Sequence, residues 1–357
     1  MEGEQDYHVR PYSPEDLTGF LELYRRVFES PVDEQWFDWK YVQNPYLDHV
    51  PIVVAERDET LVGASPGFAL RLRAGDVTCV ALQPCDVMVH PEYRNQGIFS
   101  SLLDRFIETY ERGVPELAFT FPNQQSLPAF LPEWESITHP PLYYRLLPEI
   151  ATEIVPEYAG RSIAKLVDRV VGLRDQLSVE TDDSLSVRRT ADLPVDVLAD
   201  LYESSVPNAI HSVRDEEFLE WRFSRPDRSY VAYVARRGGD ACGALIRSTP
   251  RNGTVHLLEF LPLAGRSESV STELLSAALG DVENVQSIAV LGDELPRSVL
   301  RSFSFVSLSS PPFSYVIEPR ALVVKPLRPG GSDWEVNGHD IRDPAEWRLS
   351  FVDHDTN

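Results

Sequence analysis

The chain has 357 residues, enough for two domains, and 43% of them are hydrophobic, as in soluble globular proteins. Acidic residues outnumber basic ones by 56 to 33; the formal net charge of -23 disfavours nucleic acid and anionic membranes as partners. No apolar run approaches the ~18 residues that a membrane span needs. The acidic start, Met1 to Asp6, excludes a signal or transit peptide, so we expect a cytoplasmic protein.

The basic residues are almost all arginines, since the lysines are only Lys40, Lys165 and Lys325. Acid enrichment with few lysines resembles the proteins of salt-loving archaea, whose cytoplasm screens the self-repulsion of such a surface. The cysteines form no CxxC pair, so the sequence predicts neither a disulfide framework nor a zinc site. We also assign no metal to the tail residues Asp353–Asp355, which we expect to be solvated.

The first half of the chain alternates strand and helix patterns. Ser13 and Ser30 are suitable caps for the first two helices. The predicted elements are a strand at 7–10, helices at 14–29 and 33–43, strands near 51–57, 61–72 and 76–89, a helix at 97–112, a strand at 116–121, a short helix at 124–131 and a strand at 136–147.

An internal repeat organises the chain. Residues 33–41 and 215–223 match in residue class at every position but one, and a Pro-containing turn, a strand pattern and a Gly-Ala pair follow each of them. We therefore predict two copies of one fold. The predicted domains are 1–150, a linker at 151–183 with an amphipathic helix over 160–178, a second copy at 184–320 and a C-terminal arm at 321–357.

The segment from Asp86 to Leu103 carries the clearest chemical pattern. An apolar strand breaks at His90-Pro91, and a loop with Arg94 and Gly97 opens an amphipathic helix. A helix start leaves backbone N–H groups unpaired and carries partial positive charge, so it can bind a polyphosphate without lysines. Gly97 permits close approach of the backbone, and Arg94 adds a fixed cation.

This segment, Val-His-Pro-Glu-Tyr-Arg-Asn-Gln-Gly-Ile-Phe, resembles the acetyl-CoA signature of the GNAT N-acetyltransferase family, Arg/Gln-x-x-Gly-x-Gly/Ala at a strand-to-helix turn. The resemblance implies an α/β (α+β) fold with a mixed, mostly antiparallel sheet flanked by helices, here in two tandem copies. It departs from the family at Phe99, where Gly or Ala is usual. It implies that acetyl-CoA is bound by Val87, Met88, Val89, Arg94, Asn95, Gln96, Gly97, Ile98 and Phe99.

The resemblance also suggests residues for the transfer step. Asn123 and Phe130 hold the places of a family Asn, which would contact the pantetheine arm or the acceptor region, and of a family Tyr that protonates the leaving thiolate. Phe130 has no O–H to donate, so Tyr143 and Tyr144 become the alternative donors. Asp86 is our first choice of general base; the weaker choices are Glu34, Glu135 and His90.

The second copy lacks the phosphate loop, because Gly265 and Arg266 do not follow the Arg-x-x-Gly order, and we expect no second acyl-CoA there. Glu259 occupies the strand position near that of Asp86. The predicted activity is transfer of an acetyl group from acetyl-CoA to a primary amine of a small molecule. Two alternatives stay open: a non-catalytic acyl-CoA-binding module, and a tandem-GNAT aminoacyl transferase, which would need a basic face for RNA. A homodimer also stays open.

Overall fold

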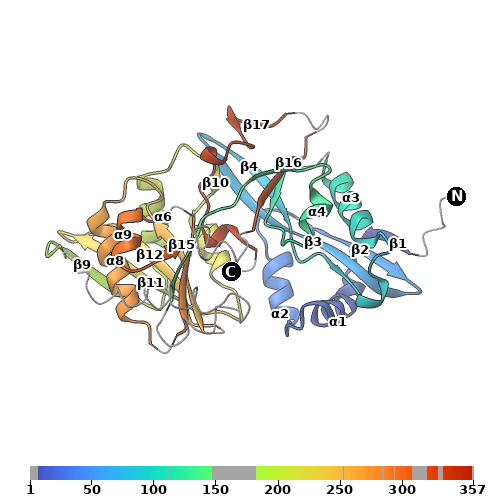
Figure 1. Ribbon diagram of the computed structural model, residues 1–357, viewed down its shortest axis with the longest axis horizontal. Helices are drawn as coiled ribbons and strands as arrows, with labels where there is room; N and C mark the ends of the chain where they lie inside the picture. The colour runs from blue at the N-terminus through green and yellow to red at the C-terminus, as the bar shows by residue number, and fades with distance from the viewer. Residues whose placement is uncertain are drawn as a thin grey trace, which may run out of the picture.

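The computed structural model describes residues 7–111, 113–146, 182–251, 253–283, 285–292, 294–307, 320–328 and 333–355. The predicted linker helix at 160–178 lies outside them. The described residues form two bodies side by side, each built on one large sheet (Figure 1). Within the described ranges, every helix is too short or too polar to cross a bilayer.

The first body holds the N-terminal elements, and its sheet has the order β1-β2-β3-β4-β6-β16-β7. Neighbours on this path are antiparallel except β4 and β6, which are parallel. The elements are β1 (His8–Pro11), η1 (Pro14–Asp16), α1 (Leu17–Phe28), α2 (Glu34–Phe37), the π-helical η2 (Asp38–Val42), β2 (Ile52–Arg57), β3 (Thr60–Ala74), β4 (Val77–Pro84), β5 (Met88–Val89), η3 (Pro91–Tyr93), α3 (Ile98–Tyr110), β6 (Pro115–Thr120), α4 (Leu127–Phe130) and β7 (Glu135–Thr138). Helices α1 and α2 lie on one side of the sheet and α3 and α4 on the other (Figure 1).

The second body repeats this plan, with the sheet order β15-β8-β14-β13-β12-β11-β9 and one parallel pair, β13 and β14. Its elements are β8 (Leu142–Leu146), β9 (Leu185–Thr190), α6 (Val195–Ser204), α7 (Glu216–Arg222), β11 (Tyr230–Arg237), β12 (Asp240–Ser248), β13 (Thr254–Leu261), α8 (Glu268–Gly280), β14 (Ser287–Leu291), α9 (Arg297–Ser302) and β15 (Val306–Ser307). The short strand β10 (His211–Ser212), between α6 and α7 in the chain, pairs with β3 of the first sheet. The arm adds β16 (Leu322–Pro326), β17 (Glu335–Val336), β18 (His339–Asp340), η7 (Pro344–Glu346) and η8 (Phe351–Asp353). The predicted fold class is thereby confirmed.

Equivalent residues of the repeat meet across the contact between the two bodies. Trp39 and Trp221 hold the same place in 33–41 and 215–223. The indole Nε1 of Trp39 donates to the carbonyl of Trp221 over 2.8 Å, and Trp221 Nε1 donates back to the carbonyl of Trp39 over 2.9 Å. The caps also correspond, because Asp33 accepts from the amide of Trp36 as Asp215 accepts from Phe218. Such reciprocal bonds are typical of two copies related by a twofold axis.

We expect Trp39→Phe to lower the free energy of unfolding by about 1 kcal/mol, because it removes the buried hydrogen bond between the two bodies and leaves the carbonyl of Trp221 with only its local donors from Ser224. Trp221→Phe should cost a similar amount, and the double variant should cost less than the sum, since both changes break one reciprocal pair. Urea denaturation measures all three. Trp334→Phe on the arm is the control, because Trp334 is only half-buried, and additive losses would contradict a shared pair.

Each sheet contains at least one strand from the other half of the chain, and the two-residue strand β10 already pairs with β3 of the first sheet. The predicted strand at 136–147 is split, because Pro140 and Pro141 cannot donate to a ladder. Its first part stays in the first sheet as β7, whereas its second part, β8, lies in the second sheet between β14 and β15. In return, β16 from the arm lies between β6 and β7 of the first sheet. The predicted limits at 150 and 320 therefore do not separate the sheets, and the domain division itself stays a prediction.

Candidate functional site

The first sheet opens where β4 ends. Up to Pro84, the chain is tied to β6, and the hydroxyl of Thr120 donates to the carbonyl of Pro84 over 2.8 Å. Asp86 then adopts a left-handed conformation with φ 47°, and the following strand, β5, pairs with Gly63 and Ala64 of β3. Among the described strands, β5 has no neighbour on its other edge. The chain thus presents an unpaired strand edge beside a break in the sheet, which can bind an extended ligand as a further strand would.

A loop after β5 leads into α3 with its backbone amides free. Asn95 and Gly97 have φ values of 63° and 82°, and residues 94–97 are all exposed. Within the described chain, no backbone N–H group of residues 94–99 donates a hydrogen bond; the side chains of Arg94 and Gln96 donate to Val89 and Glu92. Left-handed Gly97 followed by right-handed Ile98 makes successive N–H groups converge, and the helix dipole adds positive potential. The loop therefore has the chemistry of an anion site.

The start of α3 differs from the start of α8, its counterpart in the second body. Gly97 offers no side-chain cap to α3, whereas Ser267 accepts from the amide of Val270 at the start of α8. Arg94 is held beside β5, because its Nε donates to the carbonyl of Val89 over 3.3 Å. The loop thus brings a guanidinium to amides that lack partners and that a bound diphosphate would satisfy.

The two departures from the family signature are in contact. Phe130 on α4 is buried, and its ring meets that of Phe99 edge to face, with 6.3 Å between centroids. Asn123 caps the turn before α4, where its Oδ1 accepts from the amides of Gln125 and Ser126 over 3.0 Å. The aromatic ring at position 99 therefore packs against the one that replaces the expected tyrosine.

Asp86 lies in a buried charged cluster. Its Oδ2 accepts from Lys40 Nζ over 2.6 Å and from the hydroxyl of Tyr41 over 3.3 Å, and Lys40 also pairs with Asp355 over 3.0 Å. Burial raises the pKa of Asp86, although Lys40 opposes this shift. Burial would likewise raise the pKa of Asp355, but Lys40 holds it below its usual range. Cys85, Asp86 and Asp355 have ligand atoms within 4.8 Å of one another, and both carboxylates are paired with Lys40.

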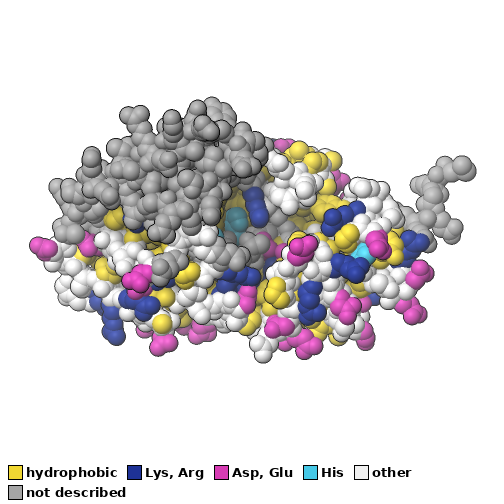
Figure 2. Space-filling view, turned by 60° about the horizontal axis from the view of Figure 1, so that its bottom comes forward, with side chains coloured by type: hydrophobic (Ala, Val, Ile, Leu, Met, Phe, Trp, Pro, Cys, Tyr) yellow, Lys and Arg dark blue, Asp and Glu magenta, His cyan; other side chains and the backbone are white. Residues whose placement is uncertain are grey.

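The prediction that the tail residues Asp353–Asp355 are solvated was wrong. Gln83 at the end of β4 holds the tail by two hydrogen bonds. Its Nε2 donates to the carbonyl of Asp353, and its Oε1 accepts from the amide of Asp355. The ring of His354 stacks on Phe121 just beyond β6, with centroids 3.8 Å apart. The space-filling view shows a hollow between the two bodies with basic and histidine side chains in it (Figure 2). The tail thus docks where the sheet opens, because buried polar partners replace the water that it would lose.

The other predicted site residues lie elsewhere. Tyr143 is buried in the core of the second body, and Tyr144 is half-buried on the same strand. Glu34 and Glu135 are exposed. His90 is occupied at both ring nitrogens, by the amide of Glu92 and by the guanidinium of Arg26. In the described part of the chain, none of these five side chains hydrogen-bonds to Asp86.

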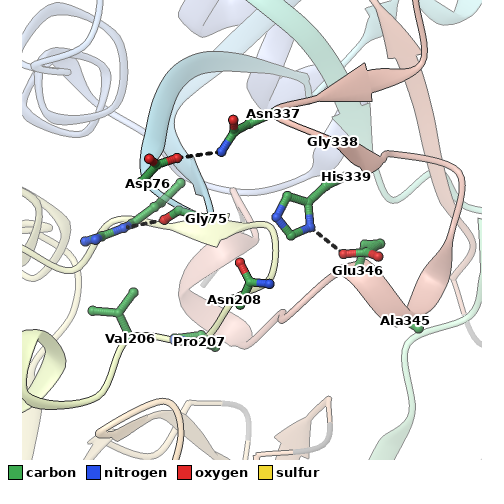
Figure 3. Close-up of a pocket in the computed structure, with 11 residues that line it drawn as sticks. Gly75, Asp76, Val206, Pro207, Asn208, Asn337, Gly338, His339, Ala345 and Glu346 are labelled. Atoms are coloured by element: carbon green, nitrogen blue, oxygen red, sulfur yellow. Dashed lines mark hydrogen bonds and ion pairs between the residues drawn. The ribbon is translucent and has the colours of Figure 1, made fainter.

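Lys40 and the tail were missed as parts of the site. Lys40 lies inside the repeated segment, and a lysine among buried aromatic positions in a lysine-poor chain was a usable signal. A polar cavity of about 780 Å³ lies near the turn between β3 and β4, at the opposite end of β4 from the loop (Figure 3). His339 pairs there with Glu346, and the cavity contains none of the predicted site residues.

Comparison with known proteins agrees with this geometry. Residues 8–130 match the family model of the acetyltransferase (GNAT) domain. A probable N-acyltransferase from Enterococcus faecalis has a similar fold at 14% identity, with a TM-score of 0.60 over 90% of this chain and 72% of that one. A GCN5-related N-acetyltransferase from Anabaena variabilis has a similar fold at 10% identity, with a TM-score of 0.59 over 90% of this chain and 73% of that one.

A tandem GNAT protein from the clavulanic acid biosynthesis pathway gives 13% identity and a TM-score of 0.54, over 90% of this chain and 98% of that one. The search of curated proteins found no match. The structural likenesses establish the fold alone, and the family match covers the part of the chain with the open strand edge and the loop. Residues 8–130 are therefore an acetyltransferase (GNAT) domain, and the chain is an acyltransferase.

Proposed function

We propose that this protein transfers an acetyl group from acetyl-CoA to a primary amine of a small molecule by direct attack. The observation that carries the proposal is the set of unpartnered amides at residues 94–99 beside the free edge of β5. The CoA diphosphate binds those amides and Arg94. The pantetheine arm lies along Val87–Val89 as an added strand, and its amide groups pair with the backbone there.

In the transfer step, the neutral amine attacks the thioester carbonyl, the C–S bond breaks, and the CoA thiolate leaves. A backbone N–H of β5 stabilises the oxyanion that develops on the carbonyl. Asp86 takes the proton that the amine loses, directly or through water. Its position supports this role, because it is the carboxylate at the break between β4 and β5, and its raised pKa makes it a stronger base. Phe130 offers no proton to the thiolate.

Titration calorimetry of the full chain with CoA and acetyl-CoA in multimolar KCl tests the binding step. Thiol release with a panel of small amines tests the transfer step. No heat of association would refute the site. Association without thiol release from any amine would instead identify an acyl-CoA-binding module, and retention of tRNA on filters would favour the aminoacyl transferase. The assays use multimolar KCl because salt screens the self-repulsion of a protein with a net charge of -23. We attribute this charge to a halophilic, cytoplasmic origin.

We expect Asp86→Asn to lower kcat by about 10²–10⁴-fold while the affinity for acetyl-CoA stays unchanged, because the amide cannot accept the proton. In the native protein, kcat/KM should fall as the pH drops through the pKa of Asp86, which lies above the usual aspartate value. Asp355→Asn is the matched control, because Asp355 shares Lys40 with Asp86. Equal losses in the two variants would assign Asp86 a structural role instead.

A further inference from the structure

The second body has a cavity at the place equivalent to the open end of the first sheet. Strand β13, the segment 262–267, helix α8 and strand β14 correspond to β4, the loop, α3 and β6. A cavity of about 670 Å³ lies here between residues 263–266 after β13, residues 294–297 after β14, and residues 344–348 of the arm. The pseudo-symmetry of the chain therefore preserves a hollow where the first body has its acyl-CoA edge.

This second hollow is not built for a diphosphate. Ser267 caps the start of α8, so fewer amides are free there than at α3. The guanidinium of Arg266 is committed to the protein, because it donates to the carbonyl of Pro262 over 2.7 Å, to the hydroxyl of Ser271 over 3.0 Å and to the carbonyl of Glu294. Arg266 thus crosslinks the segment 262–267 to its neighbours and is not available to a ligand. Arg94 in the loop before α3, in contrast, is exposed.

Two buried polar groups in the cavity wall have no hydrogen-bond partner among the described residues. The Glu294 side chain is 2% exposed, and both of its carboxyl oxygens are without a donor. The buried Nε of Arg348 also makes no hydrogen bond and lies 3.9 Å from Glu294 Oε1, which is too far for one. Burying such groups without partners is costly and uncommon, so a ligand that satisfies both at once explains their placement.

The charges around Glu294 identify the ligand's polar group. Burial, followed by the charge of Glu259, raises the pKa of Glu294 to about 8 against the opposing effects of Arg348, Arg266 and Arg214. At neutral pH the Glu294 carboxyl therefore keeps its proton and can donate. The wall then presents an O–H donor beside the guanidinium of Arg348, which together suit an anion with two acceptor oxygens.

We propose that this cavity binds a small organic carboxylate with an apolar body. The ligand's carboxylate accepts from the Nε–H of Arg348 and from the O–H of Glu294, and its apolar part packs against Leu263, Leu295 and Trp347 in the same wall. Arg297 at the rim adds to the positive charge of the site. The site is separate from the acetyl-transfer site and does not depend on that activity.

Three probes of one shape test the proposal: benzoate, benzylamine and benzyl alcohol, each added to the full chain at pH 7 in multimolar KCl. We expect only benzoate to raise the Tm in a saturable way. Arg348→Met should weaken benzoate binding about tenfold or more, whereas Arg342→Met, an exposed residue of the same arm, should not change it. Stronger binding of benzylamine, or no saturable response to benzoate, would refute the proposal.

The pH dependence gives an independent readout. Benzoate affinity should fall between pH 7 and pH 9, because Glu294 then loses its proton and repels the ligand. Glu294→Gln keeps a donor in the same place, so it should bind benzoate with an affinity that no longer depends on pH. A decline that persists in Glu294→Gln would contradict the role of this carboxyl. Gly97→Glu, a change at the loop before α3, should leave benzoate binding intact, which separates failure of this proposal from failure of the CoA site.

Discussion

Gly97→Glu should reduce the affinity for CoA at least about 100-fold. The new carboxylate would lie among the amides of residues 94–99 and beside Arg94, where it would repel the diphosphate and compete for the same donors. The protein itself has room for the side chain, because a Cβ at Gly97 would meet only the hydroxyl of Tyr7 at 3.9 Å. The left-handed φ of 82° adds strain of about 1–2 kcal/mol, which the fold can absorb. Titration calorimetry with CoA measures the loss.

Gly238→Glu is the control for both the charge and the strain. Gly238 has φ 61° in the turn between β11 and β12, and no atom lies within 4 Å of a Cβ built there. This variant should show a comparable fall in Tm but the native affinity for CoA. If Gly97→Glu binds CoA as tightly as Gly238→Glu, the diphosphate does not lie on the loop before α3, and the proposed donor site is wrong.

Asp353→Ala should destabilise the protein by about 3–5 kcal/mol. Arg214 is buried and lies between two carboxylates, with Nε 2.7 Å from Glu259 and Nη2 3.0 Å from Asp353. Removing one carboxylate leaves a buried guanidinium only partly compensated, which costs far more than the loss of an exposed pair. Urea denaturation measures the change. Glu108→Ala, which breaks the exposed pair with Arg105, should change stability by about 0–1 kcal/mol.

The contribution of Asp353 should also depend on pH. Burial opposes its ionisation, but Arg214 holds the pKa of Asp353 below its usual range. A carboxyl with a depressed pKa stabilises the fold fully above the unfolded value of about 4, and this stability is lost as the pH falls through the lower, folded value. The difference between the native protein and Asp353→Ala should therefore shrink below about pH 4. A difference that is constant with pH would contradict the ion pair.

The same variant should also lower acetyl transfer. Asp353 anchors the tail that carries Asp355, and Asp355 shares Lys40 with Asp86. Gln83 at the end of β4 hydrogen-bonds to the tail backbone on both sides of His354. Loosening the tail would expose this cluster to water and disturb Asp86. The stability of the arm and the chemistry at the open end of the first sheet are thus physically linked.

Local patterns in the chain were sufficient to predict much of this protein. The loop from Arg94 to Phe99 was predictable because its conformation depends on neighbours in sequence: a proline break, a left-handed glycine and an amphipathic helix. The repeat at 33–41 and 215–223 predicted two copies of one fold, and the protein has two sheets of matching strand order. These features depend on short-range sterics and on hydrophobic periodicity, which are visible in a single sequence.

Contacts between distant residues could not be predicted in this way. The exchange of β8 and β16 between the sheets depends on which edge each strand meets after the chain has folded. The cluster that surrounds Asp86 joins Lys40 to a tail residue 315 positions later, and the cavity beside Glu294 is lined in part by the arm. Burial decides whether such charges are solvated or paired, and burial is a property of the assembled layers, so it is settled only when segments far apart in the chain pack together.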